Sequence, residues 1–281
     1  MFTELVPEEA AAFIKNGETL GCSGFTLAGA PKALGRALAK RADALHANGE
    51  PFKVGLITGA SAGKSLDGAL ADANAISFRT PFQTDPSLRD SINEGRSCFY
   101  DMHLGLVPSY VERGILGPVD WAVIEASQVT PQGEITLTSS VGASPAFCNV
   151  AKRILIEQNS YHPTELYGIH DITNIAPPPL TDVIPVRRCS DFIGSPTIKV
   201  DPSRIVGVIR TNEPDESGSF KALDPATKKL GQNVAEFLLH ELKRGAFPGG
   251  RLLPIQAGVG NVSNALIEAM VANKEIPPFS M

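Results

Sequence analysis

Cysteine is scarce in this chain of 281 residues, and histidine is hardly more frequent. The four cysteines are scattered without a Cys-x-x-Cys pair, and the five histidines show no metal-ligand spacing. These absences argue against a zinc site or a disulfide scaffold and favour a reducing compartment. We therefore expect no metal site, no permanently bound cofactor and a cytoplasmic location.

Long apolar runs and basic tracts are lacking as well. No run approaches the ~18 apolar residues of a membrane helix. The N-terminal stretch carries Glu4, Glu8 and Glu9 and has neither the basic start nor the apolar core of a signal peptide. With a net charge of −5, nucleic acid is an unexpected partner, and so is a membrane.

The sequence instead alternates strand-like and helix-like segments. This pattern predicts an α/β fold, with an open, mainly parallel sheet and helices on both of its faces. We predict a first domain over residues 1–200 that ends in a proline-rich surface connection over 168–202. Residues 201–281 would begin a second, similar α/β domain that stops partway. The main strands are expected at residues 19–22, 52–58, 119–126, 154–157 and 205–210, and the main helices at 31–45, 142–153 and 227–245.

Two stretches share one design, a strand followed by a glycine turn and a helix. In residues 251–266 the strand is expected over 252–255 and the helix from Asn261, which would act as its cap. The helix would bury Val262, Leu266, Ile267 and Met270. A helix that begins at such a turn presents free N–H groups, so the turn suits an oxyanion, a phosphate or a carbonyl oxygen. Residues 18–34 repeat the design, although Gly21, Gly24 and Gly29 could equally make only a tight turn.

A third loop, Gly59 to Ser65, ends in Gly-Lys-Ser after a strand and so approaches a phosphate loop. That motif requires glycine where this chain has Thr58, and the loop is one residue short. We therefore interpret it as an ordinary strand–helix loop that places Ser61 at the carboxyl edge of the sheet, where ligands gather.

Several polar residues could act in catalysis or merely in structure. Asp101 and His103 could pair at a strand end, but a structural hydrogen bond is the plainer interpretation. Glu125 ends an apolar strand, where a general acid or base is conceivable, and a glutamate paired with a buried donor is the plainer expectation. Ser139 and Ser140 are interpreted as a helix-cap pair.

Taken together, these segments resemble the acetyl-CoA hydrolase/transferase family, a group of class I CoA-transferases. The motifs appear in family order across nearly the whole chain, at residues 21–32, 57–61, 101–104, 120–126, 138–142 and 255–265.

The resemblance implies an acyl-CoA:carboxylate CoA-transferase that works by ping-pong through a glutamyl-CoA thioester. CoA would be a substrate, the other partner a small carboxylate, and the enzyme a homodimer. By motif, the turn against the CoA thioester comprises Ile255, Gln256, Ala257, Gly258 and Val259, and the Val259 backbone N–H would be an oxyanion donor. Ser61 and Gly24 would lie near the acyl pocket.

The chain also departs from the family pattern. The nucleophilic glutamate of the family follows this turn and its helix, so we expect it just beyond Met281, and we assign that role to neither Glu125 nor Glu268. The chain would then be a fragment, or would pair with a chain that carries the C-terminal half. Glu216 stands where related transferases have an arginine, which puts the acceptor in doubt. An acetyl-CoA hydrolase and a non-catalytic CoA-binding subunit that lacks the nucleophile remain alternatives.

Overall fold

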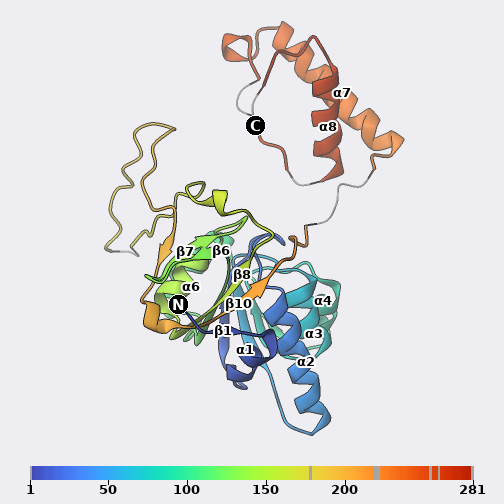
Figure 1. The fold of residues 1–281 in the computed structure, drawn as a ribbon. Helices are drawn as coiled ribbons and strands as arrows, with labels where there is room; N and C mark the ends of the chain where they lie inside the picture. The colour runs from blue at the N-terminus through green and yellow to red at the C-terminus, as the bar shows by residue number, and fades with distance from the viewer. Residues whose placement is uncertain (1, 177–178, 218–221, 253–254, 259, 280–281) are drawn as a thin grey trace. The chain divides into compact units, whose positions relative to one another are not determined.

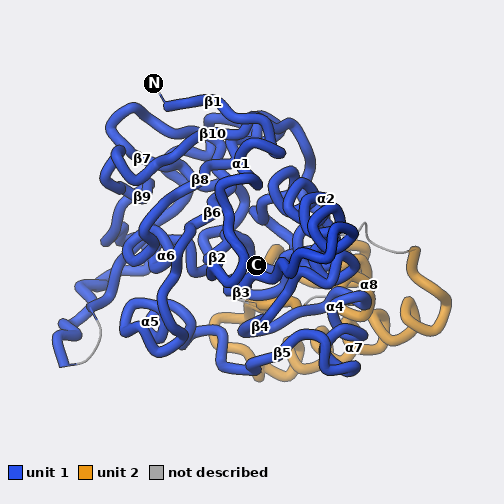
Figure 2. The backbone as a smooth tube through the Cα atoms, turned by 90° about the horizontal axis from the view of Figure 1, so that it is seen from below, with its two compact units in different colours: residues 1–217 blue, residues 218–281 orange. Residues whose placement is uncertain are grey.

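The computed structural model describes residues 2–176, 179–217, 222–252, 255–258 and 260–279. They form two compact units, Met1–Ser217 and Gly218–Met281 (Figures 1 and 2). Each unit is described by itself.

Unit 1 is built around one sheet. Its strands are β1 (Glu4–Leu5), β2 (Thr19–Cys22), β3 (Val54–Thr58), β4 (Ile76–Thr80), β5 (Cys98–Phe99), β6 (Trp121–Val129), β7 (Glu134–Leu137), β8 (Arg153–Asn159), β9 (Ile198–Lys199) and β10 (Ile205–Thr211). Its α-helices are α1 (Pro7–Phe13), α2 (Ala33–Ala47), α3 (Ala69–Asp72), α4 (Pro86–Asn93), α5 (Val107–Glu112) and α6 (Ser144–Val150).

The strand order reverses in the middle of this sheet. Along it the order is β1-β10-β8-β6-β2-β3-β4-β5, with every neighbouring pair parallel. β7 runs antiparallel to β6, and β9 antiparallel to β7. After β2 the chain adds strands on one side out to β5, and β6 then returns to the other side of β2. Ligands of open α/β sheets bind at such a switch point, beyond the carboxyl ends of the strands.

Alternate residues of the central strands point to opposite faces, and each face has its own core. On β6, Val123 packs into the core beneath α1, α2 and α3, whereas Ile124 packs into the core beneath α5 and α6. Leu155 and Ile156 divide in the same way on β8. Helices therefore cover both faces of a mainly parallel sheet, as the sequence predicts (Figure 1).

One strand belongs to a different unit from the one expected. The strand predicted over residues 205–210 to open the second domain is β10, which pairs with β8 and β1 inside the first sheet. Its apolar residues Val208 and Ile209 are buried in the two cores of unit 1. Unit 1 therefore extends to Ser217 and the boundary predicted after residue 200 is too early.

The described residues of unit 2 form two α-helices, α7 (Pro225–Lys243) and α8 (Asn261–Ala272). They cross closely at Gly231, where a Cβ atom would lie 2.4 Å from the carbonyl carbon of Ala265. The strand predicted over residues 252–255 is absent at Leu252 and Ile255, and residues 253–254 lie outside the described residues. Leu252 is nevertheless buried with Met270, whereas Val262, expected to be buried, is exposed.

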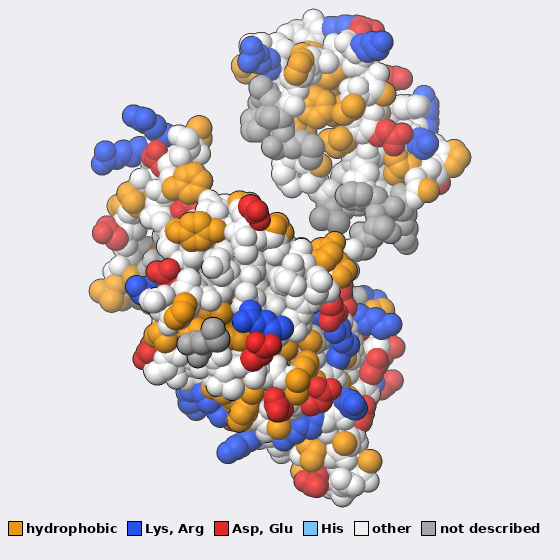
Figure 3. Space-filling model, viewed as in Figure 1, with side chains coloured by type: hydrophobic (Ala, Val, Ile, Leu, Met, Phe, Trp, Pro, Cys, Tyr) orange, Lys and Arg blue, Asp and Glu red, His pale blue; other side chains and the backbone are white. Residues whose placement is uncertain are grey.

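Acidic and basic side chains are mixed on the surface, as their similar numbers in the sequence suggest (Figure 3). Lysine, arginine, aspartate and glutamate are interspersed over the visible face of unit 1 (Figure 3). Among the described residues, none of the helices is both long and apolar enough to cross a membrane.

Candidate functional site

Three turns meet at the carboxyl edge of the sheet through their glycines. Gly24 follows β2 with φ +119°, and a Cβ atom there would lie 2.8 Å from the Cβ of Ala30. A Cβ atom at Gly59, after β3, would lie 2.8 Å from the Gly24 carbonyl oxygen and 3.1 Å from the Cα of Gly142. Side chains at these positions would force the three turns apart, so glycine fixes their close approach.

A buried ion pair fixes the loop that carries Ser61. Arg79 Nε donates to Asp67 Oδ1 at 2.7 Å, and both side chains are fully buried. Asp67 accepts the Ala62 amide, and Arg79 donates to the Ala60 carbonyl oxygen. The Ser61 side chain is 2% exposed, so the loop places it inside unit 1 and not on an open surface.

The Gly-Lys-Ser end of this loop binds a carboxylate from within the chain. Both the amide and the hydroxyl of Ser65 donate to Glu216, the hydroxyl at 2.5 Å. Gly63, with φ +88°, lets that carboxylate approach, because a Cβ atom there would lie 2.2 Å from Glu216 Oε2. Glu216, where the resemblance led us to expect an arginine, is therefore an anion that this loop binds.

Lys32 connects two glutamates on neighbouring strands. Glu125 of β6 lies opposite Glu157 of β8, and both lie on the α2 face of the sheet because each lies two residues after a residue of that face, Val123 and Leu155. The Lys32 ammonium lies 2.5 Å from Glu125 Oε2 and is 3% exposed. The Glu157 carboxylate accepts the amides of Lys32, Ala33 and Leu34 at 2.7–3.1 Å. Glu157 thus supplies the anion that the N-terminus of α2 favours.

Burial has the largest effect on the pKa values of the Glu125 and Glu157 carboxyl groups. It raises the pKa of Glu125 to about 7, against the opposing effects of Lys32 and the Thr138 hydroxyl. It also raises the pKa of Glu157, against the three amide hydrogen bonds. Glu125 is therefore paired with a buried donor, Lys32, as the plainer interpretation of the sequence expects. Its raised pKa also allows Glu125 to exchange a proton near neutral pH.

His162 and Asp215 complete this buried cluster. His162 Nε2 lies 3.6 Å from Glu125 Oε1 and 3.7 Å from Asp215 Oδ1. These three residues could offer one metal-ligand atom each, all within 4.8 Å of one another. The Lys32 ammonium, however, lies 2.5 Å from Glu125 and 3.6 Å from Asp215, and so already supplies a cation to both carboxylates. We therefore keep the prediction that this protein has no metal site.

The serines and the Asp-x-His pair have structural contacts. Ser139 donates to Asp215 Oδ2 at 2.5 Å, and Ser140 donates to the Ala28 carbonyl oxygen at 2.8 Å. The helix-cap prediction for these serines is wrong, because the cap residue before α6 is Ala143. His103 is exposed and accepts the Gly105 amide, and no hydrogen bond joins it to Asp101 among the described residues.

The predicted CoA turn lies in unit 2, just before α8. Gln256 and Gly258 are exposed, Ile255 and Ala257 are half-buried, and Val259 lies outside the described residues. The helix of 12 residues begins at Asn261, so the residue before it, Gly260, occupies the cap position that we predicted for Asn261. Ser61 and Gly24 belong to unit 1.

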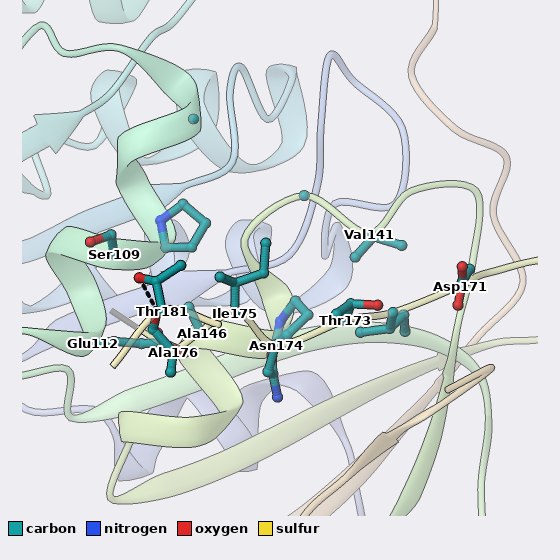
Figure 4. A pocket seen from close by; sticks show the side chains of 15 residues that line it. Ser109, Glu112, Val141, Ala146, Asp171, Thr173, Asn174, Ile175, Ala176 and Thr181 are labelled. Carbon is teal, nitrogen blue, oxygen red and sulfur yellow. Dashed lines mark hydrogen bonds between the residues drawn. The ribbon is translucent and has the colours of Figure 1, made fainter. Parts of the chain in front are cut away.

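A separate cavity of about 540 Å³ opens in unit 1 beside Gly142 (Figure 4). Ser109 and Glu112 of α5 line it, together with Asn174 and Ile175 from the connection after residue 170. Neither Ser61 nor Gly24, the predicted site residues of unit 1, lines this cavity.

Comparison with known proteins decides the family. Residues 2–210 match the model of the acetyl-CoA hydrolase/transferase N-terminal domain. The chain belongs to the acetyl-CoA hydrolase/transferase family. It is 39% identical over 280 residues to the propanoyl-CoA:succinate CoA transferase of Escherichia coli K12, covering 100% of this chain and 57% of that protein. It is 34% identical over 267 residues to the acetyl-CoA hydrolase of Schizosaccharomyces pombe, covering 93% and 51%.

A solved structure shares the fold of this chain. The crystal structure of RipA from Yersinia pestis superposes with a TM-score of 0.63 at 17% identity, covering 98% of this chain and 55% of that one. As a member of the acetyl-CoA hydrolase/transferase family, the chain spans about half the length of the curated relatives it matches.

Proposed function

We propose that this chain is part of an acyl-CoA:carboxylate CoA-transferase, with acetyl-, propionyl- or succinyl-CoA as the donor. The observation that carries the proposal is the 39% identity along the whole chain to a propanoyl-CoA:succinate CoA transferase. The glycine turns at the switch point of the sheet and the turn before α8 are compatible with it.

In this reaction a glutamate carboxylate attacks the thioester carbonyl, and CoA leaves as the thiolate. The thiolate then attacks the glutamyl carbonyl of the resulting anhydride and releases the first acid. An acceptor carboxylate repeats these two steps in reverse, so that the enzyme carries CoA as a thioester between the half-reactions. Each step passes through an oxyanion, for which we propose the Val259 N–H as a donor.

The nucleophile belongs, in this proposal, to sequence beyond Met281. Three glutamates of unit 1 that lie near the predicted site have other partners. Glu125 binds Lys32, Glu157 binds the first amides of α2, and Glu216 binds Ser65. We further propose a cytoplasmic enzyme with no permanently bound cofactor, assembled as a homodimer or with a chain that carries the C-terminal half.

Hydrolysis is the second candidate, because acetyl-CoA hydrolases are 34% identical to the chain over more than 90% of its length. One assay separates the candidates: acetyl-CoA is incubated with the protein, with and without succinate, and the CoA species are separated by chromatography. Succinyl-CoA formed only with succinate supports the transferase. Free CoA formed equally in both samples indicates the hydrolase. Acetyl-CoA that binds but stays intact indicates a non-catalytic subunit.

A further inference from the structure

The segment that follows β10 lies across the carboxyl edge of the sheet, where hydrogen bonds and an ion pair hold it. This strap, residues 212–217, carries three acidic side chains with separate partners in unit 1. Glu213 binds Arg36, Glu216 binds Ser65, and Asp215 reaches the centre of the cluster around Lys32. The backbone of Glu213 also exchanges two hydrogen bonds with the Asn159 side chain.

Asp215 ties the strap to two of the turns. Its Oδ1 accepts the Gly29 amide at 2.9 Å, in the turn after β2. Its Oδ2 accepts the Ser139 hydroxyl at 2.5 Å, in the segment after β7. Burial raises the pKa of Asp215, but these hydrogen bonds together with Lys32 and His162 lower it overall, so the group is a carboxylate at neutral pH.

Behind Asp215, one buried nitrogen is left without a partner. His162 Nε2 is buried and has no hydrogen-bond partner among the described residues, although it lies 3.6 Å from Glu125 and 3.7 Å from Asp215. One ammonium, that of Lys32, faces two carboxylates here, Glu125 and Asp215. An unpaired buried nitrogen and an excess of negative charge both favour the binding of a proton by Glu125, whose Oε1 faces His162 Nε2.

We propose that Asp215 is the positioning residue for the turns after β2 and β7, and that a proton bound by Glu125, beside His162, sets how firmly Asp215 holds these turns. With that proton bound, Glu125 is neutral and the Lys32 ammonium is free to attract Asp215. When the proton leaves, the Glu125 carboxylate retains the ammonium and repels Asp215, 3.6 Å from the same nitrogen.

The groups that face Glu125 come from every neighbouring element. Lys32 precedes α2, Glu157 lies on β8, His162 follows β8, and Asp215 lies in the strap; its polar neighbours are Thr138, Asn159 and Ser23. Burial raises the pKa of Glu125 to about 7 and lowers the pKa of His162. The hold on the strap is therefore expected to weaken as the pH rises through about 7.

Hydrogen exchange of the full chain, followed by mass spectrometry between pH 6 and 8.5 and corrected for intrinsic rates, tests this proposal. Peptides covering residues 23–32 and 211–217 should lose protection by on the order of tenfold as the pH rises. Glu125→Gln should keep them protected throughout, and Asp215→Asn should leave them weakly protected throughout. Glu50→Gln, an exposed site, is the control and should follow the wild type.

The proposal is overturned if the wild type and Glu125→Gln show the same pH dependence, or if Asp215→Asn leaves protection unchanged. Should Glu125→Gln fail to fold, His162→Gln tests the same point, because it removes the buried nitrogen that favours the proton on Glu125 and should move the loss of protection to lower pH; an unchanged profile in that variant would also overturn the proposal. The proposal and its exchange measurement rest on contacts within unit 1 and not on the proposed function. An inactive protein with the expected exchange profile would count against the transferase alone.

Discussion

Glu125 and Glu157 lie directly opposite each other on neighbouring parallel strands, and one residue, Lys32, binds both of them. Its ammonium binds Glu125 at 2.5 Å, and its backbone amide donates to Glu157 at 2.7 Å. Two buried carboxylates on adjacent strands would repel each other, and the start of α2 is placed so that a side chain and a helix N-terminus stabilise them separately.

Removing the Lys32 ammonium should therefore destabilise unit 1. We expect Lys32→Met to lower the free energy of unfolding by about 3–5 kcal/mol, because it leaves carboxylates buried without a counter-charge. Urea denaturation measures the loss, which should be larger at pH 8 than at pH 6. The double variant Lys32→Met/Glu125→Gln should recover part of it, and a Lys32→Met protein as stable as the wild type would contradict this account of the cluster.

Glu125 should also make stability depend on pH. Its pKa in the folded protein is raised from 4.5 to about 7, so its contribution is fully present below 4.5 and is lost as the pH rises through 7. The loss attributable to this group is about 3 kcal/mol across that range. Denaturation curves at pH 5, 6, 7 and 8 should show a shallower decline for Glu125→Gln. Parallel declines in the two proteins would show that Glu125 does not titrate there.

Gly59 should be intolerant of even a methyl group. A Cβ atom there meets backbone of two other turns, at Gly24 and Gly142, and backbone cannot rotate away. We expect Gly59→Ala to cost about 1–3 kcal/mol in unfolding free energy. Gly105→Ala is the matched control, since its Cβ atom would have no neighbour nearer than 3.5 Å, and it should change stability by about 0.5 kcal/mol or less. Equal effects of the two substitutions would argue against the close approach of the turns.

The oxyanion role proposed for the Val259 backbone N–H can be tested separately from the Val259 side chain. Val259→Pro removes the backbone N–H, and turnover of the complete enzyme should fall by on the order of 10²–10³. Val259→Ala keeps the N–H and should retain turnover within about tenfold. Circular dichroism should show that both variants are folded, and a folded Val259→Pro enzyme with unchanged turnover would exclude this donor.

The sequence predicted the strands of the sheet better than it predicted the cluster of charged residues around Lys32. Apolar runs locate strands such as β2 and β10, because burial on both faces leaves a local signal. The partners of Lys32 lie about a hundred residues further along the chain, and no local pattern connects them. One signal was present: the helix after Pro31 has no Ser, Thr, Asp or Asn at its start, so its first amides needed a distant acceptor, which Glu157 provides.

The placement of β10 in unit 1 could not be predicted from composition. A proline-rich connection of more than thirty residues separates β8 from β10, and such a segment normally suggests a domain boundary. Here the chain returns to the same sheet after it, because β10 pairs with β8 over most of its length.

The central claim is that CoA is carried on a glutamate of the enzyme. The most direct measurement is an intact mass spectrum of the protein after incubation with acetyl-CoA and no acceptor, followed by peptide mapping of any adduct. The account predicts a CoA-sized adduct on a glutamate outside residues 1–281. An adduct on a glutamate of this chain, or turnover with no adduct on any polypeptide, would contradict it.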